Sequence, residues 1–577
     1  MKVTSQPTQI AIVGGGPSGL FMYKQLINCG NTGLHITIYE KGNCLGCGMP
    51  YSHAGAADEH ITNVSGNEIP ELVTSVEQWI QNVSPDTLNK YRIDPASFND
   101  YKVLPRLLFG QYLAHQFKLL LDLGKQKGFV TQVLYNSPVA DIADRANDVQ
   151  VEIFKEDGTS ACYDRVIICS GHLWPKKHEG KVPGYFDSPY PPQKIALHAN
   201  HPVAVRGSSL TAIDAVRTLA RHNGEFSKGE DGILKFTANP QSEHFRIVMH
   251  SREGLLPAVR FHLQDTHLGK DTVLSPEEVQ ANRDANDGFL SLDYVFEQNF
   301  KAGIRANDPE FYEKIKDLDM EGFVDQVMGM RENMDPFELL KLEYAEAEQS
   351  IKRRESVYWK EMLAILSFAM NYPAKYFSAE DMLRLQKTLM PLISVVIAFV
   401  PQSSAETLLA LHQADRLTMV AVGKESEVIP LDEGGVLYRY KNEQGEVIER
   451  QYPLFVDCIG QPHLNYDDLP YESLAQNNTT SRARLRFKDN GVGKELKREG
   501  NNNVVKFENG DYYLTVSGLA INDHFQVVDE FNALNERIYV MAVPFIGGYN
   551  PDYSGLDFCE AASVKIAERL FNTAVVA

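Results

Sequence analysis

The feature that most constrains this chain is a glycine-rich loop directly after its first apolar segment. Glycines stand at Gly14, Gly16 and Gly19. Gly14 permits a tight turn, Gly16 lets the backbone approach a pyrophosphate, and Gly19 lets the following helix pack close to the strand. A second apolar segment ends in Glu40, where a carboxylate can accept hydrogen bonds from a ribose. The spacing predicts a βαβ unit that binds a dinucleotide.

A weaker copy of the pattern begins about 190 residues later. An apolar segment ends at Arg206, and Gly207, Ser208 and Ser209 precede a helical pattern. This loop keeps one glycine of three, and Ser209 adds a side chain where backbone should approach a pyrophosphate. Arg252 follows the next apolar segment, where a cation would meet the 2′-phosphate of NADPH. A solvated arginine with no ligand is the alternative.

Each loop is followed by a hairpin pattern and another apolar strand. The first hairpin, 149–163, leads to Ser170-Gly171, and the second, 436–452, leads to Ile459-Gly460. This internal repeat predicts an α/β fold with two Rossmann-like dinucleotide-binding domains, between which the chain crosses at these glycines. We expect FAD in the first unit and NADPH in the second.

Several short motifs resemble those of one flavoprotein family. The chain reads GMPYS at 48–52, HITNV at 60–64, EQWI at 77–80, PRLLFGQYL at 105–113 and SREGLLP at 251–257. These segments resemble the motif series of the FAD/NAD(P)-binding flavoproteins that include flavin-dependent urate hydroxylases and amino-acid N-hydroxylating monooxygenases. The resemblance covers about the first 260 residues and, more loosely, about the last 120.

The resemblance implies an FAD-dependent NAD(P)H oxidoreductase. Its expected reaction is the hydroxylation of a small polar metabolite by dioxygen through a flavin C4a-hydroperoxide. The cofactor carries that chemistry, so no catalytic triad is required and no catalytic residue is assigned. Asn63, in the HITNV motif, is the candidate flavin-side contact. An NAD(P)H-dependent flavin or disulfide reductase stays open, as does a non-catalytic flavin-binding sensor or interaction protein.

Two cysteines, Cys44 and Cys47, lie shortly after Glu40. Disulfide reductases of this general fold carry a redox pair beside the flavin, but with the wider CxxxxC spacing. A CxxC pair can cycle as a dithiol if one thiolate is stabilised. Because Cys47 runs straight into GMPYS, a structural loop is favoured over a redox pair.

Near the C-terminus, the apolar segment 537–544 runs into a glycine-rich stretch and then a helical pattern. In two-dinucleotide flavoproteins, a helix N-terminus here covers the isoalloxazine and its amides stabilise the ring. A glycine-rich surface turn is the alternative. The predicted cofactor-binding residues are Gly14, Gly16, Pro17, Ser18, Gly19, Glu40, Arg106, Gly171, Gly207, Ser208, Ser209, Arg252, Gly547, Gly548 and Gly555.

The middle of the chain changes to a run of helical patterns. Ser275, Asp335 and Ser378 each offer an N-cap with an acid three positions on. These helices are expected to form a structural or dimerisation insert, or a cap that closes over the substrate. The predicted domains are 1–195 with 465–577 for FAD, 196–264 with 406–464 for NAD(P), and 265–405 for the helical insertion.

Composition sets further limits. The formal net charge of −20 argues against nucleic acid or an anionic membrane as a partner, because both need clustered basic surface. No signal sequence or apolar run long enough for a bilayer is seen, which predicts a cytoplasmic protein. The seven cysteines imply no disulfide framework, and no metal motif is present.

Overall fold

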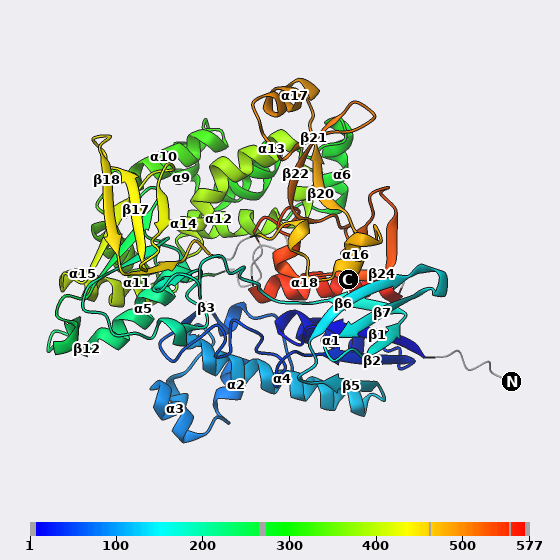
Figure 1. The fold of residues 1–577 in the computed structure, drawn as a ribbon, viewed down its shortest axis with the longest axis horizontal. Helices are drawn as coiled ribbons and strands as arrows, with labels where there is room; N and C mark the ends of the chain where they lie inside the picture. Colours follow the sequence, from blue (N-terminus) through cyan, green and yellow to red (C-terminus); the bar gives the residue numbers. More distant parts are fainter. Residues whose placement is uncertain (1–6, 265–272, 461–462, 553–554, 572–577) are drawn as a thin grey trace.

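The computed structural model describes residues 7–264, 273–460, 463–552 and 555–571 (Figure 1). A six-stranded sheet forms the centre of the first unit, with strand order β23-β24-β9-β1-β2-β5, and all its pairings except β23–β24 are parallel. Its strands are β1 (Thr8–Val13), β2 (Leu34–Tyr39), β5 (Val130–Leu134), β9 (Arg165–Ile168), β23 (Gln526–Val528) and β24 (Leu534–Val540). The first and last parts of the chain therefore share one sheet.

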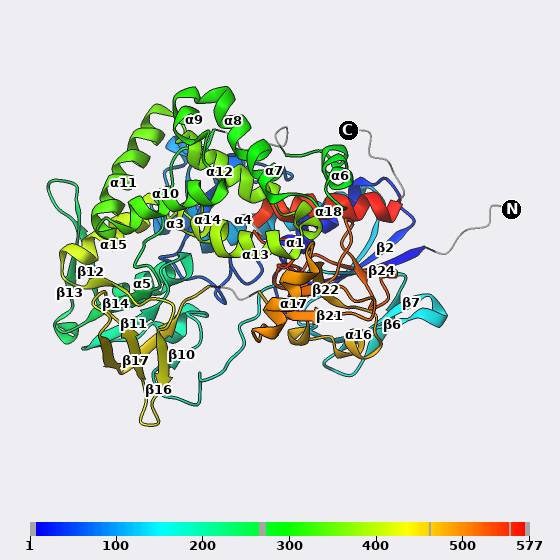
Figure 2. The same cartoon turned by 90° about the horizontal axis from the view of Figure 1, so that it is seen from above.

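Helices and smaller sheets surround this six-stranded sheet. The N-terminal helix α1 packs beside the C-terminal helix α18, although the two are more than 500 residues apart in sequence (Figure 2). The other elements of this unit include the ribbon β3–β4 and the sheet β6–β7–β8. Their bounds are α1 (Pro17–Asn28), α2 (Val76–Ile80), α3 (Pro85–Tyr91), α4 (Arg106–Gln126), α16 (Glu472–Gln476), α18 (Gly555–Phe571), β3 (Ile61–Ser65), β4 (Val103–Pro105), β6 (Val139–Arg145), β7 (Gln150–Lys155) and β8 (Ser160–Tyr163).

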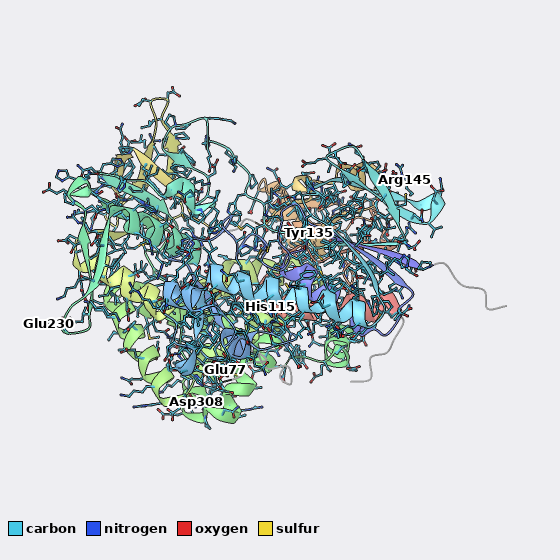
Figure 3. The ribbon with its side chains drawn as sticks, turned by 90° about the horizontal axis from the view of Figure 1, so that it is seen from below. Glu77, His115, Tyr135, Arg145, Glu230 and Asp308 are labelled. Carbon is cyan, nitrogen blue, oxygen red and sulfur yellow. The ribbon has the colours of Figure 1, made fainter. Side chains whose placement is uncertain are left out.

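A second, five-stranded parallel sheet has the order β10-β19-β11-β14-β15. Helix α5 follows β11, as the repeat predicts. The bounds are β10 (Tyr185–Phe186), β11 (Pro202–Arg206), α5 (Leu210–Asn223), β12 (Gly224–Lys228), β13 (Leu234–Ala238), β14 (Arg246–Ser251), β15 (Leu417–Ala421), β16 (Glu427–Pro430), β17 (Val436–Lys441), β18 (Val447–Tyr452) and β19 (Leu454–Asp457). Glu230, beyond β12, and Arg145, at the end of β6, lie at opposite ends of the molecule, one on each unit (Figure 3).

Most of the region between the two halves of the second sheet is helical. Its helices are α6 (Pro276–Ala285), α7 (Leu292–Phe296), α8 (Ala302–Asn307), α9 (Pro309–Ile315), α10 (Met320–Glu332), α11 (Pro336–Arg353), α12 (Tyr358–Ala369), α13 (Ala379–Arg384), α14 (Met390–Val396) and α15 (Gln402–Gln413). The predicted N-caps are confirmed: Ser275, Asp335 and Ser378 accept hydrogen bonds from the backbone amides of α6, α11 and α13. The predicted α/β fold with a helical insertion is therefore confirmed.

The boundaries of the helical insert in the structure differ from the predicted ones, because it shares hydrophobic cores with other parts of the chain. The predicted boundary at 405/406 falls inside α15, whose Leu408 and Leu411 join the core of the second sheet. Residues 482–519, predicted to belong to the FAD-binding unit, contribute Leu485 and Leu514 to the insert's core. They form a small antiparallel sheet of β20 (Arg482–Arg486), β21 (Val504–Lys506) and β22 (Tyr512–Leu519) with α17 (Asn490–Arg498). Among the described residues, no helix is long and apolar enough to cross a membrane.

Candidate functional site

The first glycine loop is held at the point where β1, β2 and β9 end. Gly14 has φ of 111°, which favours glycine, and its amide donates to the carbonyl of Tyr39 at 2.9 Å. A Cβ on Gly14 would lie 2.6 Å from the carbonyl oxygen of Cys169, and one on Gly19 would overlap the carbonyl of Gly14. A side chain at either position would therefore force the backbone to move, as expected for a loop that brings helix and strand together.

The start of α1 is open to an anion. Gly16 is the N-cap and, having no side chain, satisfies none of the first amides of the helix, and Pro17 occupies the first helical position. A Cβ on Gly16 would meet only the backbone of Gly48, 3.3 Å from its Cα. The Ser18 hydroxyl lies 3.4 Å from the thiol of Cys559 in α18. The uncapped amides and the bare backbone at Gly16 fit a pyrophosphate.

Glu40 lies directly beside this loop at the end of β2. One carboxylate oxygen accepts from the amide of Gly15 at 2.9 Å, and the other accepts from the amide of Gly42 at 2.7 Å. A carboxylate has about four acceptor sites, so lone pairs remain for a ribose diol. The structure thus brings together the residues that the sequence assigned to FAD in the first loop.

The second loop repeats this geometry. Gly207 has φ of 113°, its amide donates to the carbonyl of His250 at 2.7 Å, and a Cβ would overlap the carbonyl oxygen of Cys458. Gly207 is thus the counterpart of Gly14. Ser209, two positions later, is the N-cap of α5 and makes no side-chain cap, so the amides at the start of this helix are also open. Ser208 lies between them in the same turn.

Two arginines at the second loop differ in their partners. Arg206 forms a bidentate salt bridge with Asp457, with nitrogen–oxygen distances of 3.2 and 2.7 Å. Its charge is therefore neutralised by a residue of the same sheet. The Arg252 side chain is 61% exposed, and its nearest carboxylate is Glu253 at 3.9 Å. Ser251 stands where the first unit has Glu40. A serine followed by an exposed arginine fits a phosphorylated ribose better than a free diol.

The C-terminal loop contacts the chain where it returns from the second sheet. A Cβ on Gly547 would overlap the imidazole of His463, and the amide of Gly548 donates to the carbonyl of Ser517 at 3.0 Å. Burial lowers the pKa of His463. Gly555 begins α18, and no atom of the described residues lies within 4 Å of a Cβ built on Gly171. His463 was missed from the sequence, because it lies outside every recognised motif.

Arg106 lies at the junction between the two units. Its guanidinium donates to the carbonyl of Ile61 at 3.1 Å and to the carboxylate of Asp214 in α5 at 2.5 Å. The hydroxyl of Tyr190 donates to the same carboxylate at 2.6 Å. Asp214 was also missed, although a single acid within the apolar stretch of α5 is a signal for a buried partner. The carbonyl of Asn63, in β3, accepts from Arg260.

The insert contacts the loop that precedes α18. The Ser367 hydroxyl, in α12, donates to the Asp552 carboxylate, and the Asn371 side-chain oxygen accepts from the amide of Asp552 at 3.0 Å. Burial raises the pKa of Asp552, although the hydrogen bond from Ser367 opposes this effect. A second contact joins Lys375 to Asp523 at 2.6 Å. These contacts could not be predicted from the sequence, since the partners are more than 140 residues apart.

Two family models match parts of this chain. Residues 11–173 match the family described as FAD-NAD(P)-binding, and residues 275–397 match the family described as the YdhS-like middle domain. The chain carries an FAD-NAD(P)-binding domain. The prediction of this flavoprotein family is confirmed for that part of the chain, and FAD and NAD(P) are its cofactors, as predicted.

The uncharacterized protein YdhS of Escherichia coli K12 is 27% identical over 474 residues, which are 81% of this chain and 86% of YdhS. Among solved structures, L-lysine 6-monooxygenase from Pseudomonas syringae is 12% identical, with 98% of each chain covered and a TM-score of 0.43. The bacillithiol disulfide reductase Bdr from Staphylococcus aureus is 11% identical, with 98% of this chain and 99% of that chain covered and a TM-score of 0.43.

Proposed function

We propose that this chain is an FAD-dependent, NADPH-using monooxygenase that hydroxylates a small polar metabolite with dioxygen. Bound FAD would take up electrons from NADPH and activate dioxygen. The single observation that carries the proposal is the contact between α12 of the insert and the loop before α18. We expect the reactive ring of FAD beside the loop before α18, so this contact supports a role for the insert in enclosing the ring.

The residues of the first unit would hold FAD by its phosphates and ribose. Gly14, Gly16 and Gly19 provide a bare backbone at the start of α1, and Glu40 provides ribose acceptors. In the second unit, Gly207 supplies the turn and Arg252 a cation for the 2′-phosphate of NADPH. We thus propose for the two domains the same roles that the sequence predicts.

The insert would keep the site dry. Ser367 is fully buried and Asn371 is nearly so, and both hold the loop that runs from Gly547 to Asp552. On its other side, Gly547 lies against His463. A monooxygenase needs such enclosure, because water diverts activated oxygen into hydrogen peroxide. A simple flavin reductase has no such need.

The thiols favour this proposal over a disulfide reductase. Cys44 is exposed and Cys47 is buried. Burial, together with the neighbouring Cys44 side chain, raises the pKa of Cys47 to about 12. A reactive cysteine needs a stabilised thiolate, and this environment disfavours one.

The experiment is anaerobic reduction by NADPH followed by rapid mixing with oxygen. We expect NADPH to reduce the flavin and oxygen to give a transient absorbance distinct from both reduced and oxidised flavin. In Ser367→Ala/Asn371→Ala, FAD should stay bound, but the transient should decay faster and release more hydrogen peroxide. Ser394→Ala, an exposed position in α14, is the matched control and should behave as the parent.

Failure to reduce the flavin with NADPH would favour the sensor alternative. Reduction followed by direct reoxidation, with no transient in the parent protein, would favour a reductase. An unchanged transient in the double variant would show that the insert does not protect the site.

A further inference from the structure

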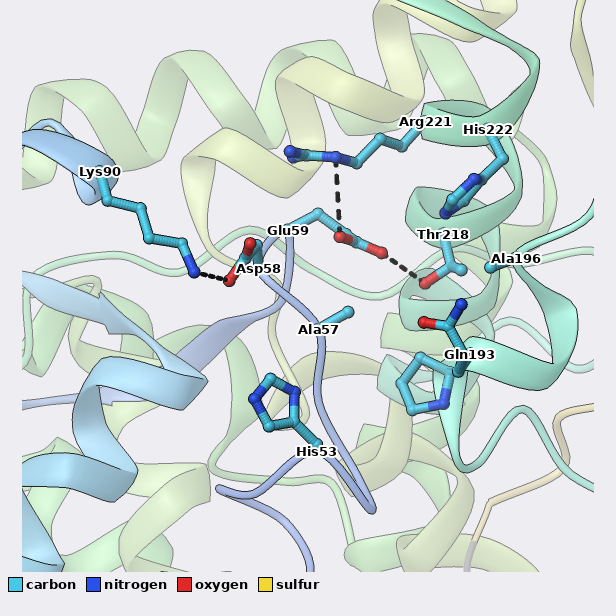
Figure 4. A pocket seen from close by; sticks show the side chains of 11 residues that line it. His53, Ala57, Asp58, Glu59, Lys90, Gln193, Ala196, Thr218, Arg221 and His222 are labelled. Atoms are coloured by element: carbon cyan, nitrogen blue, oxygen red, sulfur yellow. Dashed lines mark hydrogen bonds and ion pairs between the residues drawn. The ribbon is translucent and has the colours of Figure 1, made fainter. Parts of the chain in front are cut away.

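A pocket lies at the junction of the two units, beside α5 (Figure 4). Its volume is about 250 Å³, below the roughly 300–1,000 Å³ of sites for drug-sized ligands. One wall comes from the loop 53–59 and α3 of the first unit, and the other from 192–196 and α5 of the second. We call it the junction pocket, and its charged and imidazole side chains are His53, Asp58, Glu59, Lys90, Arg221 and His222.

Glu59 is the most buried charge in this pocket, with a side chain that is 9% exposed. One carboxylate oxygen accepts from the Thr218 hydroxyl at 2.7 Å. The other forms an ion pair with Arg221, whose Nε lies 3.9 Å away, beyond hydrogen-bonding distance, and within the described residues it accepts no hydrogen bond. Asp58, by contrast, is paired with Lys90 at 2.7 Å. A carboxylate oxygen that is this buried is stabilised by a hydrogen-bond donor, and a ligand in the pocket could provide one to Glu59.

Arg221 provides the opposite charge at the rim. Its side chain is 58% exposed, and it donates no hydrogen bond to any of the residues that the structure describes. A guanidinium with free N–H groups binds a carboxylate by two parallel hydrogen bonds. Figure 4 shows the Glu59 carboxylate between Arg221 and Thr218, with Asp58 turned to Lys90. Glu59 and Arg221 thus form an ion pair with no hydrogen bond between them, so the carboxylate oxygen and the guanidinium can each still bind a ligand group in the pocket.

We propose that the junction pocket binds a small zwitterion of the α-amino acid type. Its ammonium group would donate to Glu59, and its carboxylate would accept from Arg221. The pocket is separate from the second nucleotide loop, because Thr218 lies about 12 Å along α5 from Leu210, the first residue of the helix. Since both units line the pocket, an occupant stabilises their present arrangement. The inference goes beyond the proposed function, because this binding requires no flavin chemistry.

Calorimetry on the flavin-loaded protein tests this proposal. We expect at least one of the twenty proteinogenic amino acids to bind. Its N-acetyl derivative, which lacks the ammonium group, and its decarboxylated amine should each bind about tenfold or more weakly. Glu59→Gln and Arg221→Met should cause losses of the same order. Glu225→Gln, an exposed change just beyond α5 that does not line the pocket, should leave binding unchanged.

Three results would overturn the proposal: no amino acid binds, the blocked derivatives bind as well as the parent compound, or acetate binds equally well. If Glu59→Gln loses flavin or unfolds early, the exposed Arg221→Met variant decides, and unchanged binding in that variant refutes the site. Heats of binding are independent of NADPH turnover, so failure here is distinguishable from failure of the proposed monooxygenase activity.

Discussion

Replacing Gly19 by alanine should loosen FAD binding without unfolding the protein. A methyl group at this position would overlap the carbonyl oxygen of Gly14, which is itself fixed by the strand ends. Helix α1 must then move away from β1, although Leu20, Phe21 and Leu26 bury the helix against the core. The amides at the start of α1 move with it, away from the pyrophosphate.

Two opposing terms set the size of the effect on stability. Overpacking a core costs roughly 1–3 kcal/mol, and alanine regains about 1 kcal/mol of helix propensity over glycine. The net loss of unfolding free energy is therefore roughly 0–2 kcal/mol. Loss of one charge-assisted hydrogen bond to phosphate costs roughly 1.5–3 kcal/mol, so the FAD dissociation constant should rise about tenfold or more.

Flavin fluorescence measured on dilution reports the FAD dissociation constant, and flavin fluorescence measured on heating reports the stability of the protein. Gly329→Ala in α10 is the control, because a Cβ there has no atom within 4 Å. That variant should bind FAD as the parent does and gain up to about 1 kcal/mol of stability. If Gly19→Ala binds FAD with the affinity of the parent, the loop does not hold the cofactor in the way we propose.

Three further predictions follow from the site. Arg252→Ala should raise the apparent NADPH constant about tenfold and leave that for NADH nearly unchanged, and equal losses for both would show a structural role. Cys44→Ser/Cys47→Ser should be reduced by NADPH at the parental rate, whereas loss of a thiolate-to-flavin absorbance band would favour a disulfide reductase. Asp214→Asn should destabilise the protein by about 3–5 kcal/mol, because it breaks a buried ion pair with Arg106. Burial alone would raise the pKa of Asp214, but the nearby Arg106 and the other partners lower it. In urea unfolding, the difference in unfolding free energy between the parent and the variant should therefore hold at neutral pH and shrink below about pH 4. A difference that stays constant down to about pH 2 would contradict this prediction.

Much of the fold could be predicted because its signals are local. A glycine with positive φ at a strand end, as at Gly14 and Gly207, is a backbone requirement that sequence shows directly. Helix caps such as Ser275 and Asp335 are equally local, because each side chain accepts hydrogen bonds from backbone amides within the next three residues. In both loops a Cβ on the first glycine would overlap a backbone carbonyl oxygen, that of Cys169 at Gly14 and that of Cys458 at Gly207.

The contacts that build the site between units could not be predicted. The pairing of Arg106 with Asp214 across the junction joins segments 108 residues apart. The contact of Ser367 with Asp552 joins segments 185 residues apart, and no periodicity reports such pairs. The sequence also does not show which hydrophobic core a helix joins. Helix α15 follows the insert in sequence but packs into the core of the second sheet.

The central claim is that one oxygen atom of dioxygen enters a small polar metabolite. The most direct test incubates the protein with NADPH, isotopically labelled dioxygen and an extract of small metabolites, with mass spectrometry as the readout. We predict one product that carries a single labelled oxygen atom, formed only when protein and NADPH are both present. Complete recovery of the label in hydrogen peroxide and water, while NADPH is consumed, would contradict the account.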